Sequence, residues 1–296
     1  MYYFSIVTAT YNRSKLLPRL YTSLCNQGYK NFEWVIIDDG SFDNTTELID
    51  TWISEKIINI KLIRQENQGK HRAINNGMKQ CNSKWTAIID SDDWIKDNTL
   101  ESTKKHIEEL RLDISKDVAG IIFNSLTSDE KTLGSKFPMY IHKGRTYEYY
   151  NRYNIIGDKF DFYKTEIIKS NPFPEIDAER FISEGVIWNR INAKYYSYFI
   201  NEDYQYVEYQ SEGLSDSSIK SRVESPIGSA LVYYESSRLK MPIKKRARNL
   251  INYYRFKFHG GDFAISKPVV NLFIDMLAYF LGIIVFVKDK NKLKNY

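Results

Sequence analysis

The sequence is poor in cysteine, and the two cysteines that occur do not form a motif. Cys25 and Cys81 stand alone among 296 residues, with no CxxC pair. This excludes a cysteine-rich structural zinc site and a disulfide framework, and it fits a reducing compartment. No signal peptide precedes the first apolar segment. We therefore expect a cytoplasmic protein.

Several short motifs with a known chemistry are also missing. Neither GxGxxG nor GxxxxGK[ST] occurs, and we find no internal repeat and no nucleic-acid-binding motif. The common dinucleotide and P-loop sites therefore lack support, as does nucleic-acid binding. What remains is a chain of ordinary apolar content, 43%, with a net charge of +5. Its length suits one large domain, or one domain with an appendage.

Apolar segments and helical patterns alternate over the first third of the chain. Strands are expected at 3–10, 32–37, 58–63 and 85–89, and helices at 16–24, 45–53 and 73–80. This alternation predicts right-handed βαβ units and an α/β fold with a doubly wound, mostly parallel sheet. The loops 8–13, 38–41 and 90–93 then meet at the carboxyl edge of the sheet, where such folds bind ligands.

Three carboxylates follow the strand 85–89 directly. Asp90, Asp92 and Asp93 lie within four positions. Like charges this close repel one another unless a cation or hydrogen-bond donors compensate them. Mg²⁺ or Mn²⁺, held by one or two carboxylates together with substrate phosphate oxygens, is a natural compensation. The alternative is a solvated Asp turn that caps the next helix.

The neighbouring loops carry further candidates. Tyr11 offers a flat ring for stacking on a nucleobase, and Asp39 offers acceptors for a base or a ribose. Lys70 and Arg72, at the start of a helix, are candidate contacts for a diphosphate. The alternatives are an ordinary Asp-Gly-Ser turn at Asp39 and a solvated basic helix start.

Four segments, taken in chain order, resemble glycosyltransferase family 2. They are Ser5–Arg13, Ile36–Ser41 with Asp43 and Thr45, Asn67–Gly69 with Ala73, Asn75 and Gly77, and Ile89–Asp93. The resemblance covers residues 3 to about 100. It implies a GT-A fold, with a Rossmann-like central sheet flanked by helices, and inverting transfer from a nucleotide-sugar.

The resemblance also implies roles for single residues. Ala9, Tyr11 and Asp39 match positions that hold the nucleobase and the ribose. Asp90 matches a contact to the ribose or to bound water, and Asp92 matches a ligand of Mn²⁺ or Mg²⁺ on the diphosphate.

Two further details follow from the resemblance. Asp93 matches a position that orients sugar hydroxyls. Many members have Ala-Arg-Asn where this chain has Ala73-Ile74-Asn75. We therefore expect Lys70 or Arg72 to supply the missing positive charge.

Inverting transfer also needs a base that deprotonates the acceptor hydroxyl. In the resembling family this base lies at the start of a helix, commonly in a Glu-Asp pair, and here the pair reads Glu184-Gly185. Glu184 is the candidate base, with Asp177 and Glu179 in reserve. The alternative for Glu184 is compensation of a helix dipole.

The second half is less regular. Residues 124–160 show no clear periodicity, and the serine-rich stretch 213–225 is typical of a flexible loop, either a lid over the donor or a plain linker. No Gln-x-x-Arg-Trp sequence, which marks processive synthases in the resembling family, is present. Transfer of a single sugar is therefore favoured.

The C-terminal part is basic and aromatic. Lysines and arginines concentrate at 244–257 and 288–294, and residues 269–287 form a nearly continuous apolar run. As helices, the first presents one apolar side, and the second carries the stripe Asn271, Asp275, Ala278 and Gly282. This pattern favours a helix that lies on an anionic membrane, or one that packs on the protein, over one that spans the membrane.

Together these observations predict a glycosyltransferase domain at 1–215, with a donor half at 1–97 and an acceptor half at 98–215, and a helical extension at 216–296. The predicted reaction moves one hexose or N-acetylhexosamine from a UDP-linked donor to a glycan acceptor, carried on a lipid diphosphate, at the inner face of the cell membrane. The alternatives are an inactive nucleotide-sugar or lipid-binding module and a nucleotidyltransferase.

Overall fold

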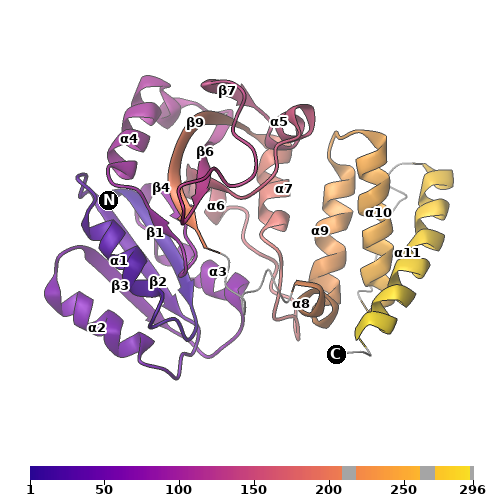
Figure 1. Cartoon of the computed structure of the whole chain (residues 1–296), viewed down its shortest axis with the longest axis horizontal. Coiled ribbons are helices and arrows are strands. Elements are labelled where there is room, and N and C mark those ends of the chain that lie inside the picture. The colour runs from indigo at the N-terminus through magenta and orange to yellow at the C-terminus, as the bar shows by residue number, and fades with distance from the viewer. Residues whose placement is uncertain (209–217, 261–270, 294–296) are drawn as a thin grey trace. The chain divides into compact units, whose positions relative to one another are not determined.

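The chain forms two compact units. The computed structural model describes residues 1–208, 218–260 and 271–293. The first unit comprises residues 1–172 and 194–210, and the second comprises 173–193 and 211–296. The first is an α/β unit, and the second is helical (Figure 1). The division into functional domains at residue 215 stays a prediction.

The first unit is built on one mixed sheet. In the described residues its strand order is β3-β2-β1-β4-β8-β6-β9-β5, and β7 pairs with β9. The strands are β1 (Tyr2–Thr10), β2 (Phe32–Asp38), β3 (Asn59–Arg64), β4 (Ser83–Ile88), β5 (Trp94–Ile95), β6 (Val118–Thr127), β7 (Ile141–Gly144), β8 (Lys159–Lys164) and β9 (Tyr196–Val207).

The four N-terminal strands confirm the predicted βαβ pattern. β1 pairs in parallel with β2 and β4, and β2 pairs in parallel with β3. β2 is buried along its whole length, as expected for a strand covered on both faces. The carboxyl ends of β1, β2 and β4 therefore lie at the same edge, which brings the loops after them together.

Helices cover this sheet. They are α1 (Leu17–Cys25), α2 (Thr45–Glu55), α3 (Lys70–Gln80), α4 (Thr99–Glu109), the 3₁₀ helix Leu112–Ile114, α5 (Thr146–Tyr153) and α6 (Thr165–Lys169). Trp34 of β2 packs face to face with Trp52 of α2, and Tyr21 of α1 stacks on the same Trp52 ring. These aromatic contacts fix α1 and α2 on one face of the sheet.

The irregular stretch 124–160 does contain regular elements. It holds the end of β6, the short strand β7, α5 and the start of β8. A small aromatic cluster, with Tyr149 stacked on Phe199, buries one side of α5. Because β7 is an edge strand and α5 has only eight residues, neither produces a long periodic pattern in the sequence.

The second unit consists of helices. They are α7 (Gly185–Lys194, whose last residue belongs to the first unit), α8 (Ser218–Glu224), α9 (Pro226–Arg238), α10 (Ile243–Phe258) and α11 (Leu272–Leu293). The prediction of a flexible loop at 213–225 is wrong for residues 218–224, which are helical; residues 213–217 lie outside the described residues. α9, α10 and α11 lie side by side (Figure 1).

The C-terminal helices differ from expectation in the faces they present. The apolar side predicted to lead α10 onto a membrane packs inside the unit, because Leu250 is buried and Tyr254 contacts α11. The predicted stripe of α11 also faces inward: Ala278 is buried, and Gly282 lies against Ile251 and Tyr254. Within the described residues, no helix combines the length and hydropathy needed to cross a membrane.

Candidate active site

The loop after β4, residues 90–93, is the most strongly charged part of the sheet edge. The Asp93 backbone N–H donates to the Asp90 carbonyl at 3.1 Å, which closes the turn. The Asp90 carboxylate forms an ion pair of 2.6 Å with Lys70 Nζ, from the first turn of α3. The β4 loop therefore meets the start of α3.

The charged forms of Asp92 and Asp93 in the β4 loop are disfavoured. Burial raises the pKa of Asp92, and the negative charge of Asp90 raises it further. Burial, together with Asp90 and Asp92, raises the pKa of Asp93 to about 9. A positive charge bound beside this loop would stabilise the charged carboxylates.

Asp93 is anchored in the protein. It is buried, and its two carboxylate oxygens accept hydrogen bonds from Gln205 Nε2 at 2.9 Å and from the Glu208 backbone N–H at 3.4 Å. These contacts tie the β4 loop to β9. The role of Asp93 in orienting sugar hydroxyls stays a prediction.

Arg19 of α1 supports the same loop from another side. Its guanidinium lies over the Trp94 ring at 4.6 Å, pairs with Glu208 Oε2 at 2.5 Å and donates to the Asp92 backbone carbonyl at 3.3 Å. Trp94 is stacked in turn on Tyr206 of β9. The Asp92 backbone is thereby held while its side chain remains only half-buried.

Asp39 organises the connection from β3 to α3. Its buried carboxylate accepts hydrogen bonds from Gln65 Nε2 at 2.7 Å and from the backbone N–H groups of Gln68 and Gly69, both at 2.9 Å. A carboxylate has about four acceptor positions, so these three donors leave about one for a ligand. The nucleoside contact of Asp39 stays a prediction.

The turn after Asp39 requires glycine. Gly40 has φ +82°, and a Cβ atom there would lie 2.9 Å from the Asn67 backbone nitrogen. Only glycine adopts this conformation without strain and lets loop 65–69 approach so closely. The loop 38–43, here called the β2 loop, is thus packed directly on the segment that leads into α3.

Tyr11 and Ala9 lie at the end of β1. The Tyr11 side chain is 41% exposed, and its ring meets Phe42 of the β2 loop edge to face at 5.9 Å. Ala9 is half-buried near the end of β1, where that strand pairs with β2. An accessible aromatic ring beside a buried carboxylate fits the predicted nucleobase site.

α3 brings the predicted cations to the same edge. Lys70 opens the helix and contacts Asp90, and Arg72 Nη1 donates to the Gln68 carbonyl at 3.2 Å. The positive end of the α3 dipole adds to the charge of these side chains. Their contact with a diphosphate stays a prediction.

The donor set of the β4 loop fits a hard divalent cation. In the part of the chain that the structure describes, no three His, Cys, Asp or Glu side chains come together as a ready cluster. Mg²⁺ and Mn²⁺ do not need one, because they combine one or two carboxylates with water and phosphate oxygens. Asp90 and Asp92 supply such carboxylates, and their mutual repulsion disfavours two charged groups without a cation.

Glu184 lies in the second unit, directly before α7. Its backbone carbonyl accepts the first helical hydrogen bond, from Trp188 at 3.1 Å, and its side chain is half-buried. The reserve candidate Glu179 has another role: its buried carboxylate accepts from the backbone N–H groups of Ile227 and Gly228 and so caps α9. The base assignment to Glu184 stays a prediction.

Sequence reasoning missed the residues that hold this site together. Gln65 and Gln68 position Asp39, whereas Arg19 and Gln205 support the β4 loop. Gln205 is 112 positions from its partner Asp93. No local spacing in the sequence links such residues, and only the sheet topology brings them together.

Comparison with known proteins agrees with this geometry. The family description "Glycosyl transferase family 2" matches residues 5–171. Glycosyltransferase GlyG of Streptococcus pneumoniae is 32% identical over 126 residues, covering 42% of this chain and 40% of the relative. The relative named poly(ribitol-phosphate) beta-N-acetylglucosaminyltransferase TarS, of Staphylococcus aureus, is 28% identical over 113 residues, covering 38% of this chain and 20% of the relative. The chain thus spans less than half the length of these relatives.

Solved structures show the same fold. TarS residues 1–349 of S. aureus, in complex with UDP-GlcNAc, match with a TM-score of 0.63 at 20% identity, covering 97% of this chain and 81% of that one. A mannosyltransferase of Pyrobaculum calidifontis, in complex with GDP-Man and Mn²⁺, matches with a TM-score of 0.56 at 14% identity, covering 97% and 87%. The predicted GT-A fold is confirmed, and the chain belongs to glycosyl transferase family 2.

Proposed function

We propose that this glycosyltransferase moves a single hexose or N-acetylhexosamine, with inversion, from a UDP-sugar to a glycan acceptor, and that it requires Mn²⁺ or Mg²⁺. The observation that carries the proposal is the β4 loop: two mutually repelling carboxylates, Asp90 and Asp92, lie at the sheet edge, and Asp90 pairs with Lys70 at the start of α3. The TarS structures with UDP and with UDP-GlcNAc support a uridine donor.

In this proposal the residues of the first unit bind and orient the donor. The exposed ring of Tyr11 stacks on the base, and Asp39 uses its remaining acceptor position for the base or the ribose. Asp90 and Asp92 hold the divalent cation, and Lys70 and Arg72 contact the diphosphate. The bound cation supplies positive charge that stabilises the departing nucleotide.

The chemical step is a displacement at the anomeric carbon. The acceptor oxygen forms the new bond, its proton passes to the Glu184 carboxylate, and the bond from the anomeric carbon to the diphosphate oxygen breaks with its electron pair leaving on UDP. The Glu184 carboxylate, at the start of α7, is assigned this role. Proton transfer to a correctly placed base raises a reaction rate by about 10²–10⁴-fold.

The acceptor is proposed to be carried on a lipid diphosphate at the inner face of the cell membrane. The basic segments at 244–257 and 288–294 support this placement, because they favour an anionic partner. TarS, by its name, glycosylates poly(ribitol phosphate), which makes an anionic surface polymer a second acceptor class to include in any screen.

A donor screen tests the proposal. Purified protein is incubated with UDP-GlcNAc, UDP-glucose, UDP-galactose, GDP-mannose and a dTDP-sugar, with Mn²⁺ or with EDTA, and nucleotide release is measured. We expect release of UDP from one UDP-sugar, and its loss in EDTA. Release from the GDP- or dTDP-sugar alone would contradict the donor assignment.

The base assignment is tested with the acceptor identified. Glu184→Gln is expected to lower the transfer rate by about 10²–10⁴-fold while leaving UDP binding unchanged. Asp177→Asn tests the reserve candidate, an exposed carboxyl in the same segment, and is expected to leave the transfer rate unchanged. If Asp177→Asn abolishes transfer and Glu184→Gln does not, the base is Asp177.

A further inference from the structure

The helix α11 turns both of its carboxylates, Asp275 and Asp289, toward the inside of the second unit. Asp275 Oδ2 accepts a hydrogen bond of 2.7 Å from the Tyr254 hydroxyl of α10. Ala278 is buried, and a Cβ atom on Gly282 would lie 2.6 Å from Tyr254 Cβ, so the two helices approach closely at this glycine. The small and polar stripe of α11 is therefore its inner face.

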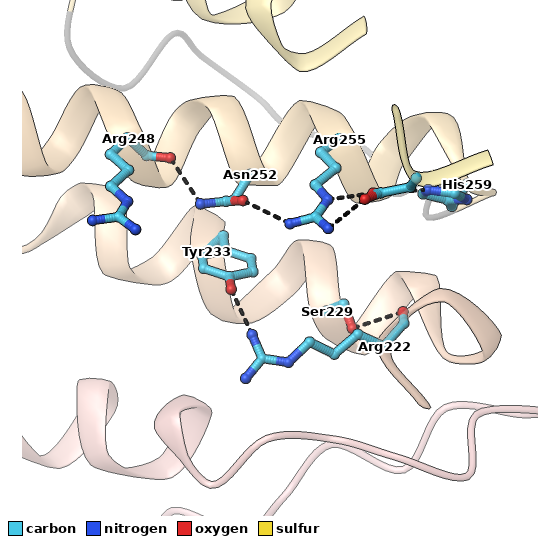
Figure 2. Close-up of polar contacts among 8 residues, drawn as sticks. Arg222, Ser229, Tyr233, Arg248, Asn252, Arg255 and His259 are labelled. Carbon is cyan, nitrogen blue, oxygen red and sulfur yellow. Dashed lines mark hydrogen bonds and ion pairs between the residues drawn. The ribbon is translucent and has the colours of Figure 1, made fainter. Parts of the chain in front are cut away.

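A buried ion pair fixes the rotation of α11. The Asp289 side chain is 9% exposed and binds the Arg255 guanidinium through both carboxylate oxygens, with Nη2 at 2.6 Å from Oδ1. His259 Nε2 lies 3.3 Å from the same carboxylate, and Asn252 links Arg255 to the Arg248 carbonyl (Figure 2). Rotating α11 would leave a buried charge without its partner, which is strongly unfavourable.

The opposite side of α11 is apolar and exposed. The exposed fractions are 68% for Phe273, 57% for Phe280 and 52% for Ile284. These residues recur at helical spacing on the side away from α10. We call the full set the α11 outer face: Leu272, Phe273, Met276, Leu277, Phe280, Ile284 and Val287. A contiguous apolar surface of this kind marks an interaction site.

The charges around this face are positive. Lys288 and Lys290 are exposed and, at about 100° per residue, lie on either side of the stripe that ends at Val287. The carboxylates of α10 and α11 are Asp275 and Asp289, and both are turned inward. Lysines beside an apolar stripe extend their ammonium groups to lipid phosphates while their methylene stems stay in the apolar region.

We infer that the α11 outer face inserts into the headgroup–acyl boundary of an anionic lipid bilayer, with the α11 axis parallel to the membrane plane. The inference rests on the proposed function only for the presence of a membrane-borne acceptor. The lysines beside the stripe favour an anionic lipid surface as the occupant, and a second copy of the chain is an outcome that the binding experiment distinguishes. The polar inner face stays packed on α10, so no residue of α11 has to leave its partner on binding.

A fluorescence experiment with the full chain tests this insertion. Phe280→Trp places an indole on the α11 outer face. None of the native tryptophans belongs to that face. With vesicles of equimolar phosphatidylglycerol and phosphatidylcholine, we expect a blue shift of its emission and quenching by brominated acyl chains. Ile114→Trp, at an exposed apolar position of the first unit, is the control and should show neither change.

A binding experiment completes the test. Phe280→Glu and Ile284→Glu should each weaken co-sedimentation with these vesicles at least tenfold, and Ile114→Glu, which adds the same charge elsewhere, should not. Donor hydrolysis should be unchanged in all three variants, so loss of membrane binding is distinguished from loss of the proposed activity. Equal vesicle binding of Phe280→Glu and the unaltered chain would overturn the inference. The inference would also be overturned if the unaltered chain does not bind the vesicles but forms a dimer, and Phe280→Glu dissociates that dimer.

Discussion

Two acidic loops lie at the same sheet edge, and their carboxylates are in opposite electrostatic states. In the β2 loop, Asp38 accepts from Ser41 and Thr46, and Asp39 accepts from three donors. In the β4 loop, burial and mutual repulsion raise the pKa of Asp92. The first loop is compensated by the protein itself, whereas the second has negative charge that the protein does not fully compensate.

Asp43 shows the same contrast from the side of the β2 loop. Burial alone would raise its pKa, but hydrogen bonds from Thr45 and Ser14 outweigh burial and lower it. Carboxylates of similar sequence surroundings therefore serve different ends. Those of the β2 loop are satisfied by donors of the protein itself, and those of the β4 loop are the ones that we propose to bind a cation.

The largest effect is expected for Asp92→Asn. If Asp92 is a metal ligand, transferase activity should fall by about 10³-fold or more, because charge stabilisation of the leaving group is lost. The melting temperature should be unchanged or higher, because a source of repulsion is removed. Activity and thermal unfolding are measured together.

Asp97→Asn is the matched control for this variant. Asp97 is an exposed carboxylate four residues beyond the β4 loop, and its substitution should leave both quantities unchanged. If Asp92→Asn instead lowers the melting temperature by several degrees and retains activity, the two loops do not differ as described.

Asp39→Asn should have the next largest effect, and on stability. Three donors, Gln65 Nε2 and the backbone N–H groups of Gln68 and Gly69, lose a charged acceptor in a buried position. We expect the free energy of unfolding to fall by about 1–3 kcal/mol, as measured by urea denaturation. Asp50→Asn, at an exposed ion pair with Arg64, is the control and should change it by less than about 0.5 kcal/mol. Equal effects of the two substitutions would show that Asp39 does not organise its loop.

The smallest effect is expected on the loss of folding stability at acidic pH. Because the pKa of Asp43 is lowered in the folded state, its contribution to stability is present above the unfolded pKa, about 3.9, and is lost as the pH falls through the folded value. Asp43→Asn should therefore flatten the loss of stability below about pH 4, by about 1 kcal/mol or less at this partly exposed site. The check is urea denaturation at a series of acidic pH values, and an unchanged acid limb would contradict it.

The parts of the fold that follow from local pattern could be predicted from the sequence. The strands β1 to β4 are long, apolar and separated by helical repeats, so their order and the edge where Asp39 and Asp92 lie follow from chain topology. The supports of the site could not be predicted, because Arg19 and Gln205 reach the β4 loop across long separations.

The C-terminal helices illustrate a different limit. The stripe with Asp275 and Gly282 is visible in the sequence, but a stripe does not state which of its two sides meets protein. The partner groups Tyr254 and Arg255 on α10 decide this, because they satisfy the carboxylates of α11 in the interior. The apolar residues are then left outside, which is the reverse of an ordinary amphipathic helix.

The ion pair between Lys70 and Asp90 has a consequence for how binding of the proposed cation and binding of the proposed nucleotide depend on each other. In the resting protein each group is the counter-ion of the other. If Asp90 binds the proposed cation, Lys70 loses this carboxylate partner and can turn to a phosphate; if Lys70 binds the phosphate, Asp90 in turn loses its counter-ion and can bind the cation. Nucleotide and metal should therefore raise each other's affinity by the same factor, as thermodynamic reciprocity requires.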